Sequence, residues 1–343
     1  MKKSLLLSMF LSLLLILAAC GNSESSEEAN DSENDENANG AESTNESEND
    51  VDYPTGNIEL IVGAGPGGGT DNFARATEGQ LSEILGTDIR ITNQEAASGA
   101  VANQTTANNA PDGHTINYVS STYIISNAGG QNDIGLDQLT PVARMQSDIL
   151  ALFVNPNQFE SFEEFMEHAE ENEARVGGTH ALSPDEMGFL ELKEASGLDG
   201  MNYVPYEGTG DVQAAVMGNN LDAYVGVISA AQDYVESGDL QPIIIFTEER
   251  LEEYPDVPVT VEDYDWDVTN GNERGVLVHS ETPPEIISTL EDALLEVYES
   301  DSYNEYEKNS NLHYREGWMG SEEYLDKLEE DQTKYEELLE SLN

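Results

Sequence analysis

The sequence predicts an α/β protein of two lobes with a ligand cleft between them. Three observations lead to this fold class. Short apolar runs alternate with segments of helical periodicity, which is typical of a sheet covered by helices. The alternation starts again after Pro141, which indicates a second unit of the same kind. A final helical stretch predicts a return to the first lobe, and a cleft between two such lobes is a preferred place for a small ligand.

The start of the chain has the features of an export signal. Two lysines precede sixteen residues of apolar character, 4–19, which are fewer than the roughly 20 that a membrane-spanning helix needs. The stretch ends in "LAAC", which looks like a bacterial lipoprotein signal, so we expect Cys20 to be lipidated after removal of residues 1–19. The protein would then sit on the outer face of the bacterial cytoplasmic membrane. The alternative is an ordinary cleaved signal with an incidental cysteine.

The next segment, 20–52, is predicted to be a disordered tether. Residues 21–52 contain twelve acidic side chains, no basic one and almost no large apolar one. Such a composition buries too little apolar surface to offset the entropy of ordering. Cys20 is the only cysteine, so a disulfide is excluded and a thiol enzyme is disfavoured.

The remaining chain is strongly acidic. Of the 69 acidic and 13 basic residues, 12 and 2 precede Tyr53, which leaves a net charge of −46. No basic stripe is present, so nucleic acid is excluded as a partner. The excess is spread along the chain and favours an adaptation to salt over a binding face.

The first lobe is predicted at 53–150. It begins with an apolar strand that runs into a glycine-rich loop and then into a helix ending at Gly86, a normal helix stop. The expected strands are 58–64, 88–93 and 114–121, the helices are 71–86 and 99–110, and their order implies parallel pairing.

The second lobe is predicted at 151–270, and 271–343 returns to the first. The helix at 161–172 has a serine at its cap, and the helix at 282–300 has prolines in its first turn. The other expected helices are 185–197, 210–219 and 321–342, and the strands are 149–155, 175–179, 202–206, 221–227, 241–246 and 274–279.

The glycine loop "GAGPGG", 63–68, admits three interpretations. A dinucleotide site needs an acidic residue at the end of the second strand, but that strand ends in Thr92–Asn93, and a phosphate loop needs a lysine near Gly69–Thr70. Nucleotide binding is therefore disfavoured. The glycines either permit a tight turn alone, or the amides of 67–70 and the positive end of the next helix receive a weaker anion such as a carboxylate.

Several motifs in order along about 200 residues resemble one family. "YPTGNIELIVGAGPGGGTDNFAR" is followed by "ITNQEAASGAVANQ", "APDGHT", "VPYEGTGDVQAAVMGNNLDA" and "YPDVPVTVEDY". These are similar to the substrate-binding proteins of tripartite tricarboxylate transporters, the TctC/Bug family. The resemblance implies the two-lobed, hinge-closing fold of type II periplasmic binding proteins. It also implies a receptor, expected as a monomer, that delivers a carboxylate to membrane permease subunits.

The resemblance also implies four ligand-holding regions. They are the glycine loop, the end of the third strand, the loop after the strand at 175–179, and the loop that opens the helix at 210–219. The residues carried over are Ala64, Gly67, Gly68, Thr70 and Asp71; Ser120, Ser121 and Thr122; Gly178, Thr179 and Ser183; and Tyr206, Gly208 and Thr209.

The chain departs from the family pattern in ways that bear on the ligand. Val62–Gly63–Ala64 lacks an aromatic residue that relatives have, while Glu186 and Glu207 stand where relatives often carry histidine and lysine. Two added negative charges make an acidic amino acid a candidate beside a di- or tricarboxylate, because its ammonium could meet a carboxylate.

The sequence offers no catalytic cluster. It has no G-x-S-x-G motif, and its five histidines lack metal-ligand spacing, so we predict no catalytic residue, no metal and no cofactor. His180 is a candidate for the cleft lining, and Arg75 and Arg274 are interpreted first as structural. Two alternative functions remain: an exported enzyme on the same scaffold, which would need a catalytic cluster in the cleft, and a sensing or adhesion lipoprotein without a transport role.

Overall fold

The computed structural model describes residues 52–340, which belong to one compact unit. The signal segment, Cys20 and the tether up to residue 51 lie outside the described residues.

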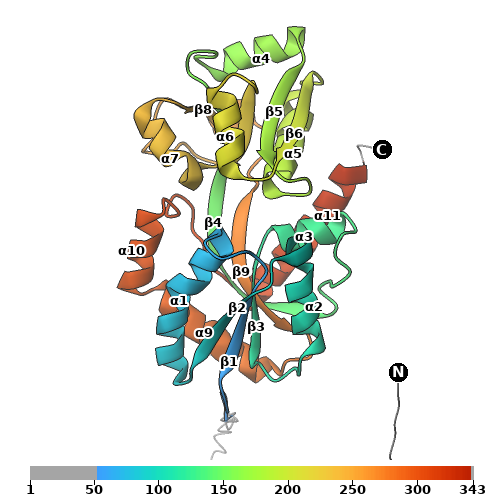
Figure 1. The fold of residues 1–343 in the computed structure, drawn as a ribbon, viewed down its shortest axis with the longest axis vertical. Coiled ribbons are helices and arrows are strands. Elements are labelled where there is room, and N and C mark those ends of the chain that lie inside the picture. The colour runs from blue at the N-terminus through green and yellow to red at the C-terminus, as the bar shows by residue number, and fades with distance from the viewer. Residues whose placement is uncertain (1–51, 341–343) are drawn as a thin grey trace, which may run out of the picture. The chain divides into compact units, whose positions relative to one another are not determined.

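The lower lobe in Figure 1 is built on three parallel strands in the order β2-β1-β3, followed by β9, which runs antiparallel to β3. Its strands are β1 (Ile58–Val62), β2 (Ile89–Asn93), β3 (Thr115–Ser120) and β9 (Gly271–His279). Its helices are α1 (Gly69–Leu85), α2 (Ala100–Asn108), α3 (Thr122–Ala128), α9 (Pro284–Tyr298) and α10 (Asp301–Asn309), with the short 3-10 turn η1 (Ala96–Gly99) before α2.

The upper lobe has a second sheet, in which β6, β5 and β7 are parallel and β7 pairs antiparallel with β4. Serine side chains start two of its helices: Ser161 accepts from Glu164 N, and Ser183 accepts from Glu186 N. The strands are β5 (Ala174–Thr179), β6 (Met201–Tyr206), β7 (Ala223–Val227) and β8 (Gln241–Ile245). The helices are α4 (Phe162–Glu171), α5 (Pro184–Ser196), α6 (Thr209–Met217), α7 (Ile228–Ser237) and α8 (Thr260–Tyr264).

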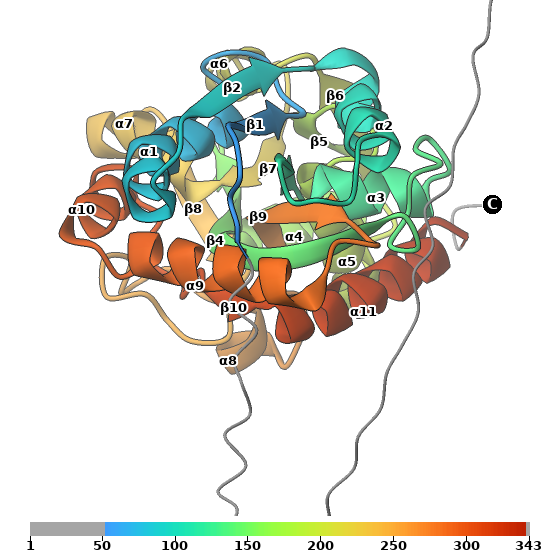
Figure 2. The ribbon, with the colours of Figure 1, turned by 90° about the horizontal axis from the view of Figure 1, so that it is seen from below.

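The strands β4 and β9 run between the two lobes. Strand β4 (Leu139–Val154) pairs with β9 along its first part and with β7 and β8 along its last part, so it belongs to both sheets. The helix α11 (Ser321–Glu340) packs on β4 and α3 and reaches α5 of the upper lobe. Figure 2 shows α9 and α11 along the side of β4 that faces away from β2.

Several sequence expectations need correction. The strand expected at 149–155 is the end of a 16-residue strand, because Pro141 lies at a register shift in β4 and does not interrupt it. The first sheet is mixed, not purely parallel, since β9 lies antiparallel to both of its neighbours, β3 and β4. The sequence pattern did not predict α3, α7, α8 and α10, which are helices of at most ten residues.

Candidate functional site

A cavity of about 370 Å³ lies where β1 and β3 end and α1 and α3 begin. Its lining comes from the lower lobe, except for His180, which follows β5 in the upper lobe. The lining residues are Gly63, Ala64, Gly65, Thr70, Glu95, Ser98, Gly99, Asn103, Tyr118, Val119, Ser120, Thr122, Tyr123 and His180. The sequence-predicted residues Ala64, Thr70, Ser120 and Thr122 therefore meet in one place.

The side chain of Asp71 stabilises the conformation of the glycine loop. Its carboxylate accepts from Gly67 N at 2.8 Å, from Asn93 Nδ2 at 2.9 Å and from Arg75 Nε at 2.8 Å. The hydrogen bond from Arg75 is the main reason that the pKa of Asp71 falls to about 2. Asp71 is buried, and neither it nor Gly67 and Gly68 line the cavity. Its position suits a brace, and Gly67 allows the turn with a φ of +82°.

Strained backbone gathers on two loops at this cavity. Seven non-glycine residues in 52–340 have a positive φ, and four of them are Ala97, Ser98, His180 and Leu182. The first two lie in η1 and the last two in the loop between β5 and α5. Such conformations cost about 1–3 kcal/mol each and cluster at ligand sites, where the surrounding structure maintains them.

Ser121 does not line this cavity, although Ser120 and Thr122 on either side of it do. Its Oγ accepts from Glu273 N at 2.9 Å, and its own amide donates to Glu273 O at 3.0 Å. Ser121 lines a second cavity, beside the paired strands β4 and β9, and not the first cavity.

The predicted residues of the upper lobe have local partners. Thr179 donates from both N and Oγ1 to Asp185, at 2.8 and 2.6 Å, and burial raises the pKa of Asp185 to about 6. Ser183 caps α5, while Glu186 accepts from Leu182 N at 2.6 Å. Glu186 is thus engaged at the start of its own helix.

The other upper-lobe candidates also lie off the cavity lining. Gly178 packs so closely on Tyr203 that a Cβ would collide with it. Tyr206 O accepts from His180 N at 2.8 Å, so Tyr206 supports the loop that carries His180. Glu207 is exposed. Gly178, Thr179, Ser183, Tyr206, Gly208 and Thr209 are not among the residues that line the cavity.

Sequence reasoning missed Glu95. Its carboxylate lies directly over Gly65, where any Cβ would collide with it. The signal was available in principle, since Glu95 follows β2, whose carboxyl end shares an edge of the sheet with the glycine loop. No lysine or arginine lines this cavity, so Glu95 is its one formal charge apart from any on His180.

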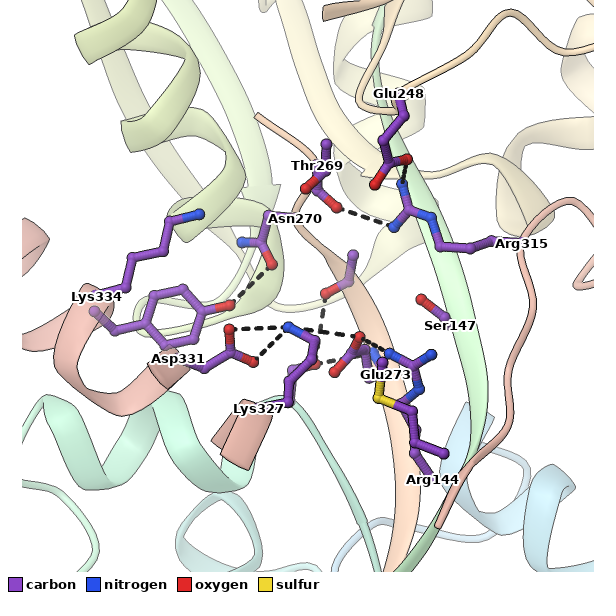
Figure 3. Close-up of a pocket in the computed structure, with 14 residues that line it drawn as sticks. Arg144, Ser147, Glu248, Thr269, Asn270, Glu273, Arg315, Lys327, Asp331 and Lys334 are labelled. Carbon is purple, nitrogen blue, oxygen red and sulfur yellow. Dashed lines mark hydrogen bonds and ion pairs between the residues drawn. The ribbon is translucent and has the colours of Figure 1, made fainter. Parts of the chain in front are cut away.

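The second cavity, of about 280 Å³, is shown in Figure 3 and is lined largely by β4, β9 and α11, the elements between the lobes that we call the hinge. Lys327 of α11 lies between Asp331, at 2.9 Å, and Glu273 of β9, at 3.8 Å. Burial lowers the pKa of Lys327, but these two carboxylates outweigh it and raise the pKa overall. Glu273 also pairs with Arg144 of β4. The network thereby ties β4, β9 and α11 together.

Within residues 52–340, we find no helix with the length and apolar character needed to cross a bilayer.

A family model described as "Tripartite tricarboxylate transporter family receptor" matches residues 73–343. A UPF0065 protein of Bordetella pertussis is 30% identical over 216 residues, and the protein BugT of the same organism is 26% identical over 223. Each alignment covers 61% of this chain and 66% of the relative, slightly under two thirds of its length.

Solved structures of related proteins have the same fold. A TctC solute-binding protein from Polaromonas, without ligand, has a TM-score of 0.74 at 24% identity, covering 84% of this chain and 99% of its own. MatC from Rhodopseudomonas palustris with bound malate has a TM-score of 0.68 at 21% identity, covering 83% and 99%. A second R. palustris protein, with adipate, has a TM-score of 0.71 at 21% identity, covering 84% and 98%.

These matches confirm the predicted two-lobed fold and the predicted family. The chain belongs to the tripartite tricarboxylate transporter receptor family, whose members are solute-binding receptors and not enzymes.

Proposed function

We propose that this protein is an extracytoplasmic receptor that holds a small carboxylate in the cavity at the start of α1 and delivers it to a tripartite tricarboxylate transporter permease. One observation carries the proposal: strained loops from both lobes, with the hydroxyls of Thr70, Ser120 and Thr122, meet at a single cavity of about 370 Å³. Pockets of this size suit small organic ligands.

The cavity suits an anion held by uncharged donors. The glycine loop leads into α1, a 17-residue helix whose cap, Gly68, offers no side chain to its first amides. The amides and the positive helix end favour a carboxylate there. Related structures with malate and with adipate support this ligand class.

Glu95 refines the ligand class. A di- or tricarboxylate would place a second negative charge near Glu95 without a lysine or arginine in the lining to offset the repulsion. An amino acid presents a carboxylate to the loop and an ammonium to Glu95. We therefore propose an amino acid, with a plain dicarboxylate as the competing ligand.

Thermal unfolding against a ligand panel tests the receptor function. The panel contains acidic and neutral amino acids, malate, adipate, citrate and nucleotides. A ligand at 100 times its dissociation constant should add about 2.7 kcal/mol of stability. A nucleotide as the only stabilising compound would contradict the proposal.

The variant Glu95→Gln then separates the two ligand classes. If the ligand carries an ammonium that meets Glu95, its affinity falls at least about tenfold, as for the loss of one charge-assisted hydrogen bond. If the ligand is a dicarboxylate, the same change strengthens binding. The exposed Glu83→Gln variant carries the same charge change on α1 and should leave affinity unaltered.

The membrane attachment and the lobe boundaries follow as further parts of the proposal. We propose lobes at 53–150 and 151–270, a return at 271–343, and closure on ligand as the state that the permease recognises. Lipid at Cys20 would keep the receptor near the permease. Palmitate labelling of the wild type, and its absence in Cys20→Ser, would test the anchor.

A further inference from the structure

A third cavity, of about 500 Å³, lies on the other side of the first turn of α1. In Figure 1 it corresponds to the region where α7 of the upper lobe faces α1 and α10 of the lower lobe. Strands β4 and β9 contribute Asp148 and Arg274 to its lining. The rest of the lining comes from α1, α7, α10 and the loop after α10, and it includes Gly69, Asn72, Arg75 and Ser229.

Arg274 is the notable residue of this cavity. It is only 8% exposed, and its Nη1 donates to Gln146 Oε1 at 3.2 Å. Its Nε is enclosed and has no hydrogen-bond partner, and no carboxylate forms an ion pair with it in the part of the chain described. A buried cation without a paired anion is costly. By contrast, the buried Arg144 of the hinge pairs directly with Glu273.

The guanidinium of Arg274 lies against the start of α1. A Cβ at position 69 would collide with Nη2 of Arg274, so the glycine there permits this approach. The positive end of α1, whose cap residue contributes no side-chain hydrogen bond, therefore adds to the charge of Arg274. Arg75 lines the same space but is bound to Asp71.

Asp148 is the one carboxylate in the lining, and it already has a partner. It accepts from Ser229 Oγ at 2.5 Å. Burial raises the pKa of Asp148 to about 6, although Arg274 opposes that shift. Asp148 thus lies near Arg274 without contacting it, and an anion in the cavity beside Arg274 and the first turn of α1 would complete the pairing of the arginine.

We propose that this third cavity is a binding site for a small oxyanion, a carboxylate or an inorganic oxyanion, held by Arg274 and Asn72 at the start of α1. It is separate from the cavity that contains Glu95. Because the lining includes β4 and α7 as well as α1 and α10, a bound anion would favour the arrangement in which these elements lie together.

Isothermal titration with sulfate and with acetate, at fixed ionic strength, tests the site and separates the two kinds of anion. We expect one equivalent of at least one of them to bind the wild type, and Arg274→Gln to weaken that binding at least tenfold. Arg90→Gln is the matched control, since Arg90 is an exposed arginine of β2 with no ion pair among the described residues. Its binding should equal that of the wild type.

Two further variants protect the test against a loss of folding in Arg274→Gln. Gly69→Ala displaces the guanidinium and should also weaken the anion at least tenfold, while Asp148→Asn removes a repelling charge and should tighten it. If neither anion binds the wild type, or if binding is equal in the wild type and both Arg274→Gln and Gly69→Ala, the proposal is wrong and Asp148 alone balances Arg274.

The test of the third cavity can fail without affecting the proposed receptor function of the first cavity. Stabilisation by the ligand of the first cavity is measured in the same variants. If that stabilisation persists while sulfate and acetate fail to bind, only the third cavity loses its assignment.

Discussion

Asp71 shows how a single buried side chain can fix the shape of the glycine loop. It receives hydrogen bonds from the glycine loop, from β2 through Asn93 and from α1 through Arg75. The glycine loop therefore has a fixed shape without a ligand, which under the proposed function lowers the ordering cost of binding.

Replacing Asp71 by asparagine should lower the free energy of unfolding by about 1–3 kcal/mol at neutral pH, because the charge-assisted bonds to a buried group are lost. The pKa of Asp71 in the folded protein is about 2, below its ordinary value of 3.8. Its stabilisation is thus complete above the unfolded pKa and is lost as pH falls toward about 2. Urea unfolding of the wild type and the variant measures the difference.

Asp88→Asn provides the control for this prediction, since Asp88 is an exposed aspartate of the same lobe. Equal losses in the two variants at neutral pH would mean that the brace is not a stabilising feature. A difference between wild type and Asp71→Asn that persists undiminished at about pH 2 would contradict the low pKa.

At the scale of elements, α11 couples the two lobes. Its residues Tyr324, Leu328 and Tyr335 are buried in the large apolar cluster that includes parts of both lobes. Lys334 pairs with Glu191 of α5 at 3.1 Å, and Tyr335 donates to Asn270 Oδ1 at 2.9 Å. The helix α11 therefore packs against the hinge and contacts both lobes.

Leu328→Ala should lower the free energy of unfolding by about 2–5 kcal/mol, since Leu328 is 3% exposed and its truncation leaves a cavity. Leu325→Ala, on the same helix but only half-buried, should cost clearly less. Chemical unfolding of both variants checks the prediction. A similar cost at both positions would show that the packing of α11 on β4 and α3 is not what stabilises it.

Elements with a strong local pattern could be predicted from the sequence, and elements that depend on distant partners could not. The strand β1 and helix α1 were expected because an apolar run precedes a glycine loop and a periodic helix that ends at Gly86. The length of β4 depends on pairing with β9, more than a hundred residues away. The helix α3 has only seven residues, which are too few to show a helical period in the sequence.

The site was predictable to the same extent. Ala64, Thr70, Ser120 and Thr122 lie at or shortly after the carboxyl ends of two strands of one sheet, so topology brings them together. Ser121 and Asp71 alternate with them along the chain, and local geometry turns them to other partners. Glu95 comes just before a turn in which Ala97 and Ser98, two non-glycine residues, have positive φ, and the sequence gives no signal for this conformation.

At the scale of the whole molecule, the acid excess extends into the interior. Burial is the largest cause that raises the pKa of five carboxyl groups in the part of the chain that the structure describes, two of them in α5 and one of them Asp331 of α11. The values are about 6 for Asp148 and Asp185 and about 7 for Glu191 and Glu307. Lys334 opposes the shift of Glu191 but does not cancel it. In the folded protein these groups therefore hold their protons at a higher pH than they do in the unfolded chain.

These raised pKa values predict that the free energy of unfolding falls as pH rises from about 5 to about 8. A carboxyl group with a raised pKa contributes its full stabilisation below its unfolded pKa, and that contribution is lost as pH rises through its folded pKa. Asp71 acts in the opposite sense and only below about pH 4, so the maximum stability should lie near pH 4 to 5. Urea unfolding across this range, in high salt to screen the surface repulsion, measures the free energy of unfolding as a function of pH.

The variant Glu191→Gln should flatten the slope of this pH curve above about pH 5, while Glu170→Gln, at an exposed position of α4, should leave the slope unchanged. A wild-type curve that rises toward pH 8 would show instead that ion pairs such as Lys334–Glu191 outweigh the cost of burying the charge.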